Sequence, residues 1–400
     1  MASLRQNTWT LDEWYAQDVA GNAEEVIEGQ WWVWGASEDG SLGLNEQANY
    51  PASVSKSSPT QLPGTTWSLS GHGSNFQRVT KSDGTLWTFG PNSDGRLGLN
   101  DRTERSSPCQ VGTDTSWRRV LGTYSACMGT KTDGTLWTWG NNGGGSLGQN
   151  QAPPAAISSP TQVGTDTTWD LDTFSTGIGQ RHMFAVKTDG TLWAWGDNSH
   201  AQLGLGNKNG RSSPMQVGTD TTWALGENKI VGGYQSTAAI KTDGTLWTWG
   251  TNEGGQLGTD VPAYTDCSSP KQVGSATYWD QVWMGSRASY AFKTDGTLWV
   301  WGENAQGCLA VPLPTYPQIS TSPRQVGTDT NWSKMIIGTR ASGAIKSDGT
   351  LWTWGNAENG TTGQNNRTNY ASPKQVGTDT SWSDGWGGEA VIYARKNNPG

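Results

Sequence analysis

The side chains that most often perform catalysis or bind metals are few in this chain. Only three histidines occur, and the four cysteines show no short paired spacing. A catalytic base needs a nucleophile or a partner acid beside it, and a structural zinc site needs closely spaced Cys and His ligands. We therefore expect no catalytic residue, no cofactor site and no metal site. We interpret the histidines as surface or polar-packing residues.

One acidic position recurs along the chain in the phrase V-G-T-D-T-x-W, at Asp114, Asp166, Asp220, Asp329 and Asp379. Recurring carboxylates can bind calcium, but one aspartate per repeat at a turn position is typical of a side chain that accepts local backbone N–H groups. The glycine-rich stretch 141–148 follows a predicted strand, but no Lys-Ser/Thr pair follows it, so it does not indicate a phosphate-binding loop.

The chain is organised by an internal repeat. The phrase K-T-D-G-T-L-W-T-W-G occurs at 131–140 and again at 241–250. The first Trp of each W-x-W/F-G unit lies at Trp32, Trp87, Trp137, Trp193, Trp247, Trp299 and Trp352. A second Trp and a Ser-Pro pair each recur seven times as well. A period of about fifty residues with seven copies predicts a propeller or a solenoid.

Each repeat is predicted to form four short strands. The A-I-K-T and T-L-W-T-W-G segments flank Asp-Gly, as in Asp243-Gly244, which favours a hairpin with a type I′ turn. Leu246 lies on one face of the second segment and Trp247 and Trp249 on the other, which suits a sheet buried on both faces.

Both ends of the chain supply part of a repeat. The last repeat stops near its hairpin turn at Lys396, and residues 28–32 begin with the missing second half. One blade made from both termini would close a ring and remove the exposed sheet edges. We therefore predict an all-β, seven-bladed propeller over residues 30–400, closed by pairing of the N- and C-terminal segments, after an N-terminal extension over residues 1–29.

Composition limits the range of partners. The net charge of −8 disfavours nucleic acid, which requires a basic surface. No segment has the length and apolar character of a signal peptide or a membrane span, so we expect no membrane insertion. The 25 tryptophans supply apolar area for a core in a chain that has few aliphatic residues.

The pattern T-D-G-T-L-W-x-W-G-x-N-x-x-G-x-L-G, from Thr242 to Gly258, resembles the regulator of chromosome condensation repeat family. The resemblance covers roughly residues 30–400 and implies a seven-bladed propeller. The sixth and seventh units depart from it at Cys308-Leu309-Ala310 and Thr361-Thr362-Gly363, where we expect differently shaped loops. The founding member of the family looks like a nucleotide-exchange factor and chromatin binder. Its blade insertions and basic arm have no match in this chain, so the resemblance does not imply either activity here.

The loops between W-x-W-G and Ser-Pro vary in length, and insertions in propellers gather on one face, which is often the binding face. Tyr and Arg are favoured contact residues. The predicted partner-binding residues are Tyr50, Arg102, Arg105, Lys208, Arg211, Tyr264, Tyr316 and Tyr370. The alternative is that these are ordinary variable surface loops.

The N-terminal extension carries a capping-box signature at Thr10–Glu13 and a plausible C-cap at Gly21, which predict a short helix. The predicted anchor residues are Trp9, Leu11, Trp14, Tyr15 and Val19. This segment either packs on its own propeller or docks onto another protein.

The leading hypothesis is a non-enzymatic structural and binding module. Its near-identical repeats resemble those of bacteriophage particle proteins, which implies a tail- or capsid-associated virion protein assembled in the host cytoplasm. Its partners would be other virion proteins through residues 1–29, and a host-surface receptor or protein ligand on the loop face. The alternative is a soluble protein-binding regulator or inhibitor, and an exchange factor is the third hypothesis.

Overall fold

The computed structural model describes residues 32–37, 43–45, 54–61, 76–123, 125–151, 156–176, 181–304, 307–311, 318–338, 341–357, 362–364, 366–387 and 392–396. The chain forms two compact units. The first comprises Met1–Asn142 with Pro154–Thr167, and the second comprises Gly143–Pro153 with Thr168–Gly400.

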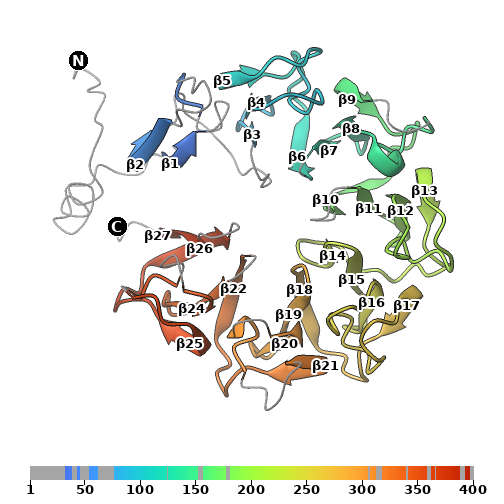
Figure 1. Cartoon of the computed structure of the whole chain (residues 1–400). Helices are drawn as coiled ribbons and strands as arrows, with labels where there is room; N and C mark the ends of the chain where they lie inside the picture. Colours follow the sequence, from blue (N-terminus) through green and yellow to red (C-terminus); the bar gives the residue numbers. More distant parts are fainter. Residues whose placement is uncertain are drawn as a thin grey trace. The chain divides into compact units, whose positions relative to one another are not determined.

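The first unit contains antiparallel sheets whose strands follow chain order (Figure 1). A two-stranded sheet pairs β1 (Trp32–Ser37) with β2 (Val54–Gln61). A three-stranded sheet has β3 (Gln77–Thr80), β4 (Leu86–Gly90) and β5 (Arg105–Gln110). A four-stranded sheet has β6 (Trp117–Gly122), β7 (Ala126–Lys131), β8 (Leu136–Gly140) and β9 (Ile157–Gln162).

The second unit contains four sheets of four strands each and a two-stranded sheet among the described residues. They are β10 (Trp169–Thr176), β11 (His182–Lys187), β12 (Leu192–Gly196) and β13 (Arg211–Gln216); β14 (Ile230–Gly232), β15 (Ser236–Ile240), β16 (Leu246–Gly250) and β17 (Cys267–Gln272). They continue with β18 (Trp279–Met284), β19 (Ala288–Lys293), β20 (Leu298–Glu303) and β21 (Ile319–Gln325); β22 (Trp332–Ile337), β23 (Ala341–Lys346), β24 (Leu351–Gly355) and β25 (Tyr370–Gln375). The last pair is β26 (Trp382–Gly387) and β27 (Ile392–Lys396). The 3-10 turn η1 (Gly143–Gly145) also belongs to this unit.

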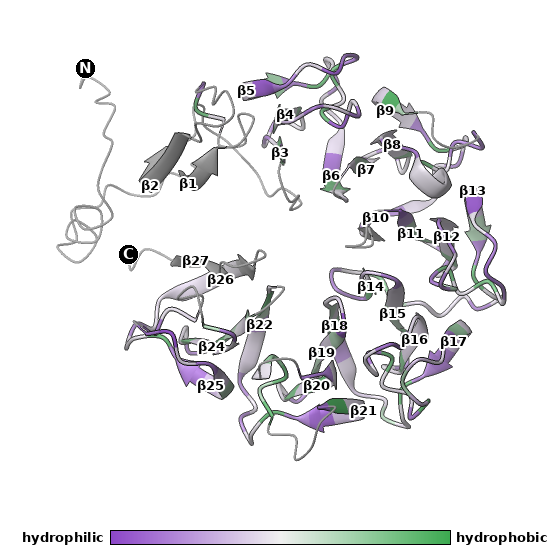
Figure 2. Ribbon diagram, in the orientation of Figure 1, coloured by the Kyte–Doolittle hydropathy of each residue, from purple (hydrophilic) through white to green (hydrophobic). Residues whose placement is uncertain are grey.

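The repeated antiparallel sheets confirm the predicted all-β fold. Each complete sheet has the predicted four strands, and its second and third strands are buried on both faces. All six residues of β7 are buried, for example. The fourth strands are more polar, and β5, β13 and β25 are coloured largely hydrophilic in Figure 2. The second and third strands are buried because their sequences are largely apolar, and the fourth strands are more exposed because theirs are polar.

The core lies between consecutive sheets of the same unit. Trp249 of β16 is fully buried against Phe184 and Leu203, which belong to the β10–β13 sheet and the connection that follows β12. Its indole N–H donates to the Gln202 carbonyl, 2.8 Å away. The same bond recurs from Trp139, Trp195, Trp301 and Trp354 to the carbonyls of Arg96, Ser146, Gln256 and Cys308. The third strand of each of these sheets is therefore joined to a loop that precedes it by about one repeat.

The hairpin between second and third strands is present, but its turn is not the predicted type I′. Gly244 has a positive φ of 76°, whereas Asp243 is not among the described residues with positive φ. The Asp243 carboxylate accepts the Thr245 backbone N–H at 2.9 Å and its hydroxyl at 2.7 Å. The Thr245 hydroxyl in turn accepts the indole N–H of Trp247 at 2.8 Å. This side-chain network selects a turn that needs positive φ only at glycine.

The turn at Ala310 keeps the backbone of the other repeats, but the loop that follows it differs as expected. The Asn304 amide donates to the Val311 carbonyl, seven residues on, where the Asn252 amide donates to the Val261 carbonyl, nine residues on. Ala310 adopts a φ of 59°, close to the 65° of Gly258 at the equivalent position. Its backbone N–H donates to Gly307, as that of Gly258 donates to Gly255. The surrounding hydrogen bonds impose the left-handed turn on alanine at a small cost in strain. Gly363 has the same φ of 65° as Gly258.

The predicted helix and the predicted closure lie outside these observations. Residues 1–29 are not among the described residues, so the helix and the boundary at residue 30 stay predictions. The two-stranded sheets β1–β2 and β26–β27 are each half of a four-stranded repeat. Their pairing with one another also stays a prediction. Among the described residues, no helix is long and apolar enough to cross a membrane.

Candidate protein-binding surface

The connections between third and fourth strands carry the residues predicted to bind a partner. In the described sheets they run over residues 91–104, 197–210 and 251–266, which join β4 to β5, β12 to β13 and β16 to β17. We call these three segments and their equivalents the cd loops. Each cd loop leaves the carboxyl end of its third strand, so every cd loop lies at the same end of its own sheet.

A buried asparagine organises each of these cd loops. Asn198 accepts the backbone N–H of Leu203 at 2.9 Å and donates to the carbonyls of Asn207 and Asn209 at 2.8 and 3.0 Å. Asn92 and Asn252 make the same kind of contacts in their own loops. One side chain thereby holds both the start and the end of a loop that has no regular secondary structure. The G-x-N pattern was present in the sequence, but we did not predict that its asparagine joins the two ends of the loop.

Neighbouring repeats within the second unit fix the cd loops further. The Gly206 backbone N–H donates to the Ser268 carbonyl of β17 at 2.7 Å, and that of Asp260 donates to Thr321 of β21 at 3.0 Å. The Lys208 ammonium pairs with Asp266 of the next cd loop at 2.8 Å. The cd loops are therefore held in place by contacts with the next repeat, as a recognition site on loops requires.

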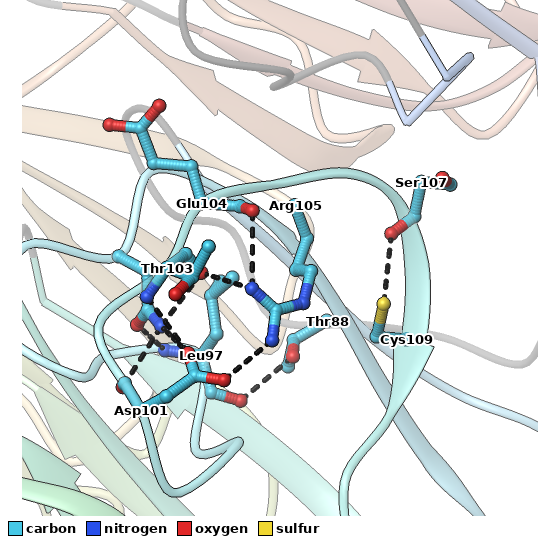
Figure 3. A network of polar contacts seen from close by, with 9 residues as sticks. Thr88, Leu97, Asp101, Thr103, Glu104, Arg105, Ser107 and Cys109 are labelled. Atoms are coloured by element: carbon cyan, nitrogen blue, oxygen red, sulfur yellow. Dashed lines mark hydrogen bonds and ion pairs between the residues drawn. The ribbon is translucent and has the colours of Figure 1, made fainter.

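Arg105 braces its own loop (Figure 3). Its guanidinium contacts the Asp101 carboxylate at 2.5 Å and the Thr103 carbonyl at 2.7 Å. The Thr103 backbone N–H hydrogen bond, with Arg105 nearby, lowers the pKa of Asp101 below its ordinary value. Arg102 beside it is exposed. The two arginines predicted as equivalent contacts therefore differ, because Arg105 has its donors occupied within the loop.

Of the other predicted contact residues, some have partners within the structure and some lie outside the described residues. Lys208 is exposed, with its ammonium paired to Asp266. Arg211 is half-buried at the start of β13 and donates to the Gly210 carbonyl. The Tyr370 hydroxyl accepts from Asn366 at 2.9 Å. Tyr50 and Tyr316, and the anchor residues Trp9, Leu11, Trp14, Tyr15 and Val19, lie outside the described residues.

Tyr264 is the most prominent of the predicted contact residues. Its side chain is 77% exposed, and its backbone adopts a φ of 68°. A positive φ is an outlier for a bulky residue and persists only where the surroundings enforce it. The bond from the Tyr264 N–H to the Asn252 carbonyl at 2.7 Å does so here.

A charged bridge that the sequence did not reveal lies close to Tyr264. Arg287, between β18 and β19, contacts Glu303 at 3.1 Å and Glu253 at 3.2 Å. Its hydrogen bond to Glu303 raises the pKa of Arg287, and the charges of Glu303, Glu253 and Tyr264 act in the same direction. Arg287 was missed because it lies in a different inter-strand connection from the cd loops, and only the fold brings the two connections together.

The recurring aspartates have structural partners. Asp114 accepts the Ser116 backbone N–H at 2.9 Å, and Asp379 accepts that of Ser381 at 3.0 Å, which confirms the predicted local role. Asp114 also forms an ion pair with Lys131 at 2.6 Å. Although partial burial opposes it, hydrogen bonding to Lys131 and Ser116 lowers the pKa of Asp114 to about 2. In the part of the chain that the structure describes, no group of three or more His, Cys, Asp or Glu side chains is arranged to hold a metal ion.

Comparison with known proteins places this geometry in a family. The family model described as the RCC1-like domain matches residues 26–311. The Arabidopsis thaliana protein RUG3, a mitochondrial RCC1 domain-containing protein, is 28% identical over 316 residues, 75% of this chain and 67% of that protein. The ultraviolet-B receptor UVR8 of the same plant is 25% identical over 82% of this chain and 73% of its own. The human probable E3 ubiquitin-protein ligase HERC6 is 31% identical over 46% of this chain, which spans only 18% of that protein.

Solved structures show the same fold. Human WBSCR16 is 20% identical with a TM-score of 0.73, over 93% of this chain and 99% of its own. Prp20p of Saccharomyces cerevisiae, described with its binding to Gsp1p and histones, is 17% identical with a TM-score of 0.70, over 93% of this chain and 92% of that one. With most of its length matched by the family model and its sheets matching those of solved relatives, the chain is a β-propeller that belongs to the family of RCC1-like domains.

Proposed function

We propose that this propeller is a protein-binding module whose recognition surface is the cd-loop edge of the second unit. The observation that carries the proposal is Tyr264, an exposed tyrosine at positive φ on a cd loop whose two ends are held together by Asn252. A related propeller is described as binding other proteins, which supports the same class of function.

The surroundings of Tyr264 have the properties of an interaction site. Tyrosine and arginine, with tryptophan, are the residues most enriched where interfaces gain their binding energy. A rigid tyrosine also loses little conformational entropy on binding, because only two side-chain torsions are free. Arg287 is 52% exposed and is held by two carboxylates, so its aliphatic stem and guanidinium plane are pre-oriented. The structure thus offers an aromatic contact and an ordered charged contact on adjacent repeats.

Two matched tyrosines test the proposal. Tyr264 and Tyr278 lie in the connections at opposite ends of β17 and are 77% and 62% exposed. Tyr264→Ala, Arg287→Ala and Tyr278→Ala are compared with the unaltered chain by quantitative affinity purification from the source cells. Each protein that depends on Tyr264 is then purified and titrated directly. We expect Tyr264→Ala to weaken binding by about thirtyfold or more, since losing an interface hot spot costs about 2 kcal/mol or more.

Tyr278 is the control, because it is an exposed tyrosine outside the proposed surface. Tyr278→Ala should leave that binding unchanged, and all three variants should melt at the temperature of the unaltered chain. Equal losses in Tyr264→Ala and Tyr278→Ala, or binding that no cd-loop variant weakens, would place recognition elsewhere on the molecule.

The finer assignment, a virion protein anchored through residues 1–29, is part of the same proposal. It is supported by the near-identical repeats rich in Thr, Asn, Gly and Trp, and by three aromatic residues in the extension. The human, plant and yeast relatives described above lend it no support. Deleting residues 1–25 should leave a folded propeller that no longer co-sediments with particles. Normal incorporation of the truncated chain would exclude this anchor, and a soluble regulator would then be the remaining form of the proposal.

A further inference from the structure

A lysine at the end of the second strand lies between two indole rings in most of the described sheets. In the β14–β17 sheet, the Lys241 ammonium is 5.0 Å from the ring centroid of Trp223 and 4.1 Å from that of Trp247. In the β18–β21 sheet, Lys293 is 4.9 Å from Trp279 and 3.6 Å from Trp299. Both lysines therefore have the same aromatic surroundings.

In three sheets an aspartate from V-G-T-D-T-x-W completes this arrangement. The ammonium groups of Lys131, Lys241 and Lys346 contact Asp114, Asp220 and Asp329 at 2.6, 2.9 and 2.9 Å. The side chains of these lysines are only 9%, 10% and 8% exposed. The carboxylate neutralises the ammonium and closes the position at the same time.

The β18–β21 sheet lacks this carboxylate. Its phrase reads V-G-S-A-T-Y-W, so that Ala276 occupies the position of Asp220. Among the described residues Lys293 has no ion pair, and it is half-buried where its paired counterparts are buried. Replacing a carboxylate with a methyl group thus leaves this ammonium more exposed than its counterparts and without an ion pair among the described residues.

The charged groups near Lys293 do not replace the missing aspartate. Asp280 of β18 pairs with Lys229, and the Asp295 carboxylate accepts the hydroxyl and backbone N–H of Thr297. Burial lowers the pKa of Lys293, and only the charge of Asp295 opposes it. The two indole faces also favour the ammonium form, but Lys241 has two such rings as well. The absent carboxylate is therefore the feature that distinguishes Lys293.

We propose that Lys293 is an acylation site, modified by activated acyl donors such as acyl phosphates or thioesters. The neutral amine attacks the acyl carbon and an amide C–N bond forms. The bond from that carbon to the phosphate oxygen or thiolate sulfur breaks, the leaving group departs with the electron pair, and the amine proton passes to solvent. Acylation here leaves no aspartate without its partner, whereas acylation of Lys241 would leave Asp220 unpaired. The site lies at the end of the sheet opposite Tyr264 and does not depend on the proposed binding function.

The experiment compares lysines within one folded chain. The full-length protein is incubated with acetyl phosphate at pH 8, and acetylation of each lysine is followed over time by peptide mass spectrometry. Exposed Lys271 reports the reactivity of a solvated amine. We expect Lys293 to react severalfold faster than Lys241, because the Lys241 ammonium is buried and paired with Asp220, whereas Lys293 is more exposed and has no such pair among the described residues.

Two reciprocal substitutions identify the cause. Ala276→Asp restores the residue found in the neighbouring repeat and should slow Lys293 to the rate of Lys241. Asp220→Ala should accelerate Lys241 toward the rate of Lys293. Either substitution decides the question if the other lowers the melting temperature. Equal rates at Lys293 and Lys241 in the unaltered chain, or rates that neither substitution changes, would overturn the proposal.

Discussion

At the scale of single residues, polar groups in this protein are used to hold loops and indoles in place. The aspartate, threonine and tryptophan of each T-D-G-T-L-W segment form one chain of hydrogen bonds, as in Asp243, Thr245 and Trp247. The hydrogen bond from the Thr245 hydroxyl is the first cause that lowers the pKa of Asp243. The Asp243 carboxylate is thus occupied by donors from its own repeat.

His182 predicts an acid-sensitive step in stability. It is buried at the start of β11, and desolvation lowers its pKa from 6.5 to about 4, opposed by the charge of Asp197. The unfolded chain therefore binds a proton at His182 between pH 6.5 and about 4 while the folded chain does not. As the pH falls through that window, the free energy of unfolding should decrease by up to about 3 kcal/mol.

The measurement is the free energy of unfolding from pH 7 to pH 4 for the unaltered chain and for His182→Gln. The variant should show a shallower loss, because it no longer takes up this proton. His200→Gln, in the cd loop after β12, is the matched control and should keep the original slope. Parallel curves for all three proteins would show that His182 contributes nothing to acid sensitivity.

At the scale of elements, the cd loops are ordered by a side chain and not by their length or composition. We expect Asn198→Ala to remove three hydrogen bonds of a buried amide and to lower the free energy of unfolding by about 1–3 kcal/mol. Asn209→Ala makes the same chemical change at an exposed position of the same loop and should cost less than about 0.5 kcal/mol.

Hydrogen exchange of residues 197–210 separates this effect from general destabilisation. Protection in this loop should fall in Asn198→Ala more than protection in β11 and β12. A uniform loss across the β10–β13 sheet would mean that the asparagine supports the whole sheet rather than the loop.

At the scale of the whole molecule, the arithmetic of strands leads to the prediction of closure. β26 and β27 correspond to the first and second strands of a repeat, and β1 and β2 to the third and fourth. Pairing of residues 388–396 with residues 30–35 would combine them into one four-stranded blade. Deleting residues 391–400 should then lower the melting temperature by several degrees and expose an unpaired strand edge.

Hydrogen exchange of β1 is the direct readout of closure. Its amides should lose protection when residues 391–400 are removed, although those residues lie more than 350 positions away in the sequence. Deleting only residues 397–400, which follow β27, should leave this protection intact. Unchanged protection of β1 in the longer deletion would contradict closure by the two termini.

The sequence by itself determined the repeat, the four strands of each unit and the β-propeller fold. These follow from local patterns: alternation, Asp-Gly hairpins and a Trp at fixed spacing, which act within a few residues of one another. The turn type was mispredicted, and Ala310 adopts the turn of a glycine, because hydrogen bonds from neighbouring side chains and backbone outweigh the preference of the residue itself. Only the folded structure showed that Arg105 is occupied, that Arg287 lies beside Tyr264, and that the aspartate replaced by Ala276 is the ion-pair partner of the equivalent lysine in other repeats. The last two depend on which groups from different connections meet, because charge and hydrogen bonding act through space, where distance along the chain has no influence.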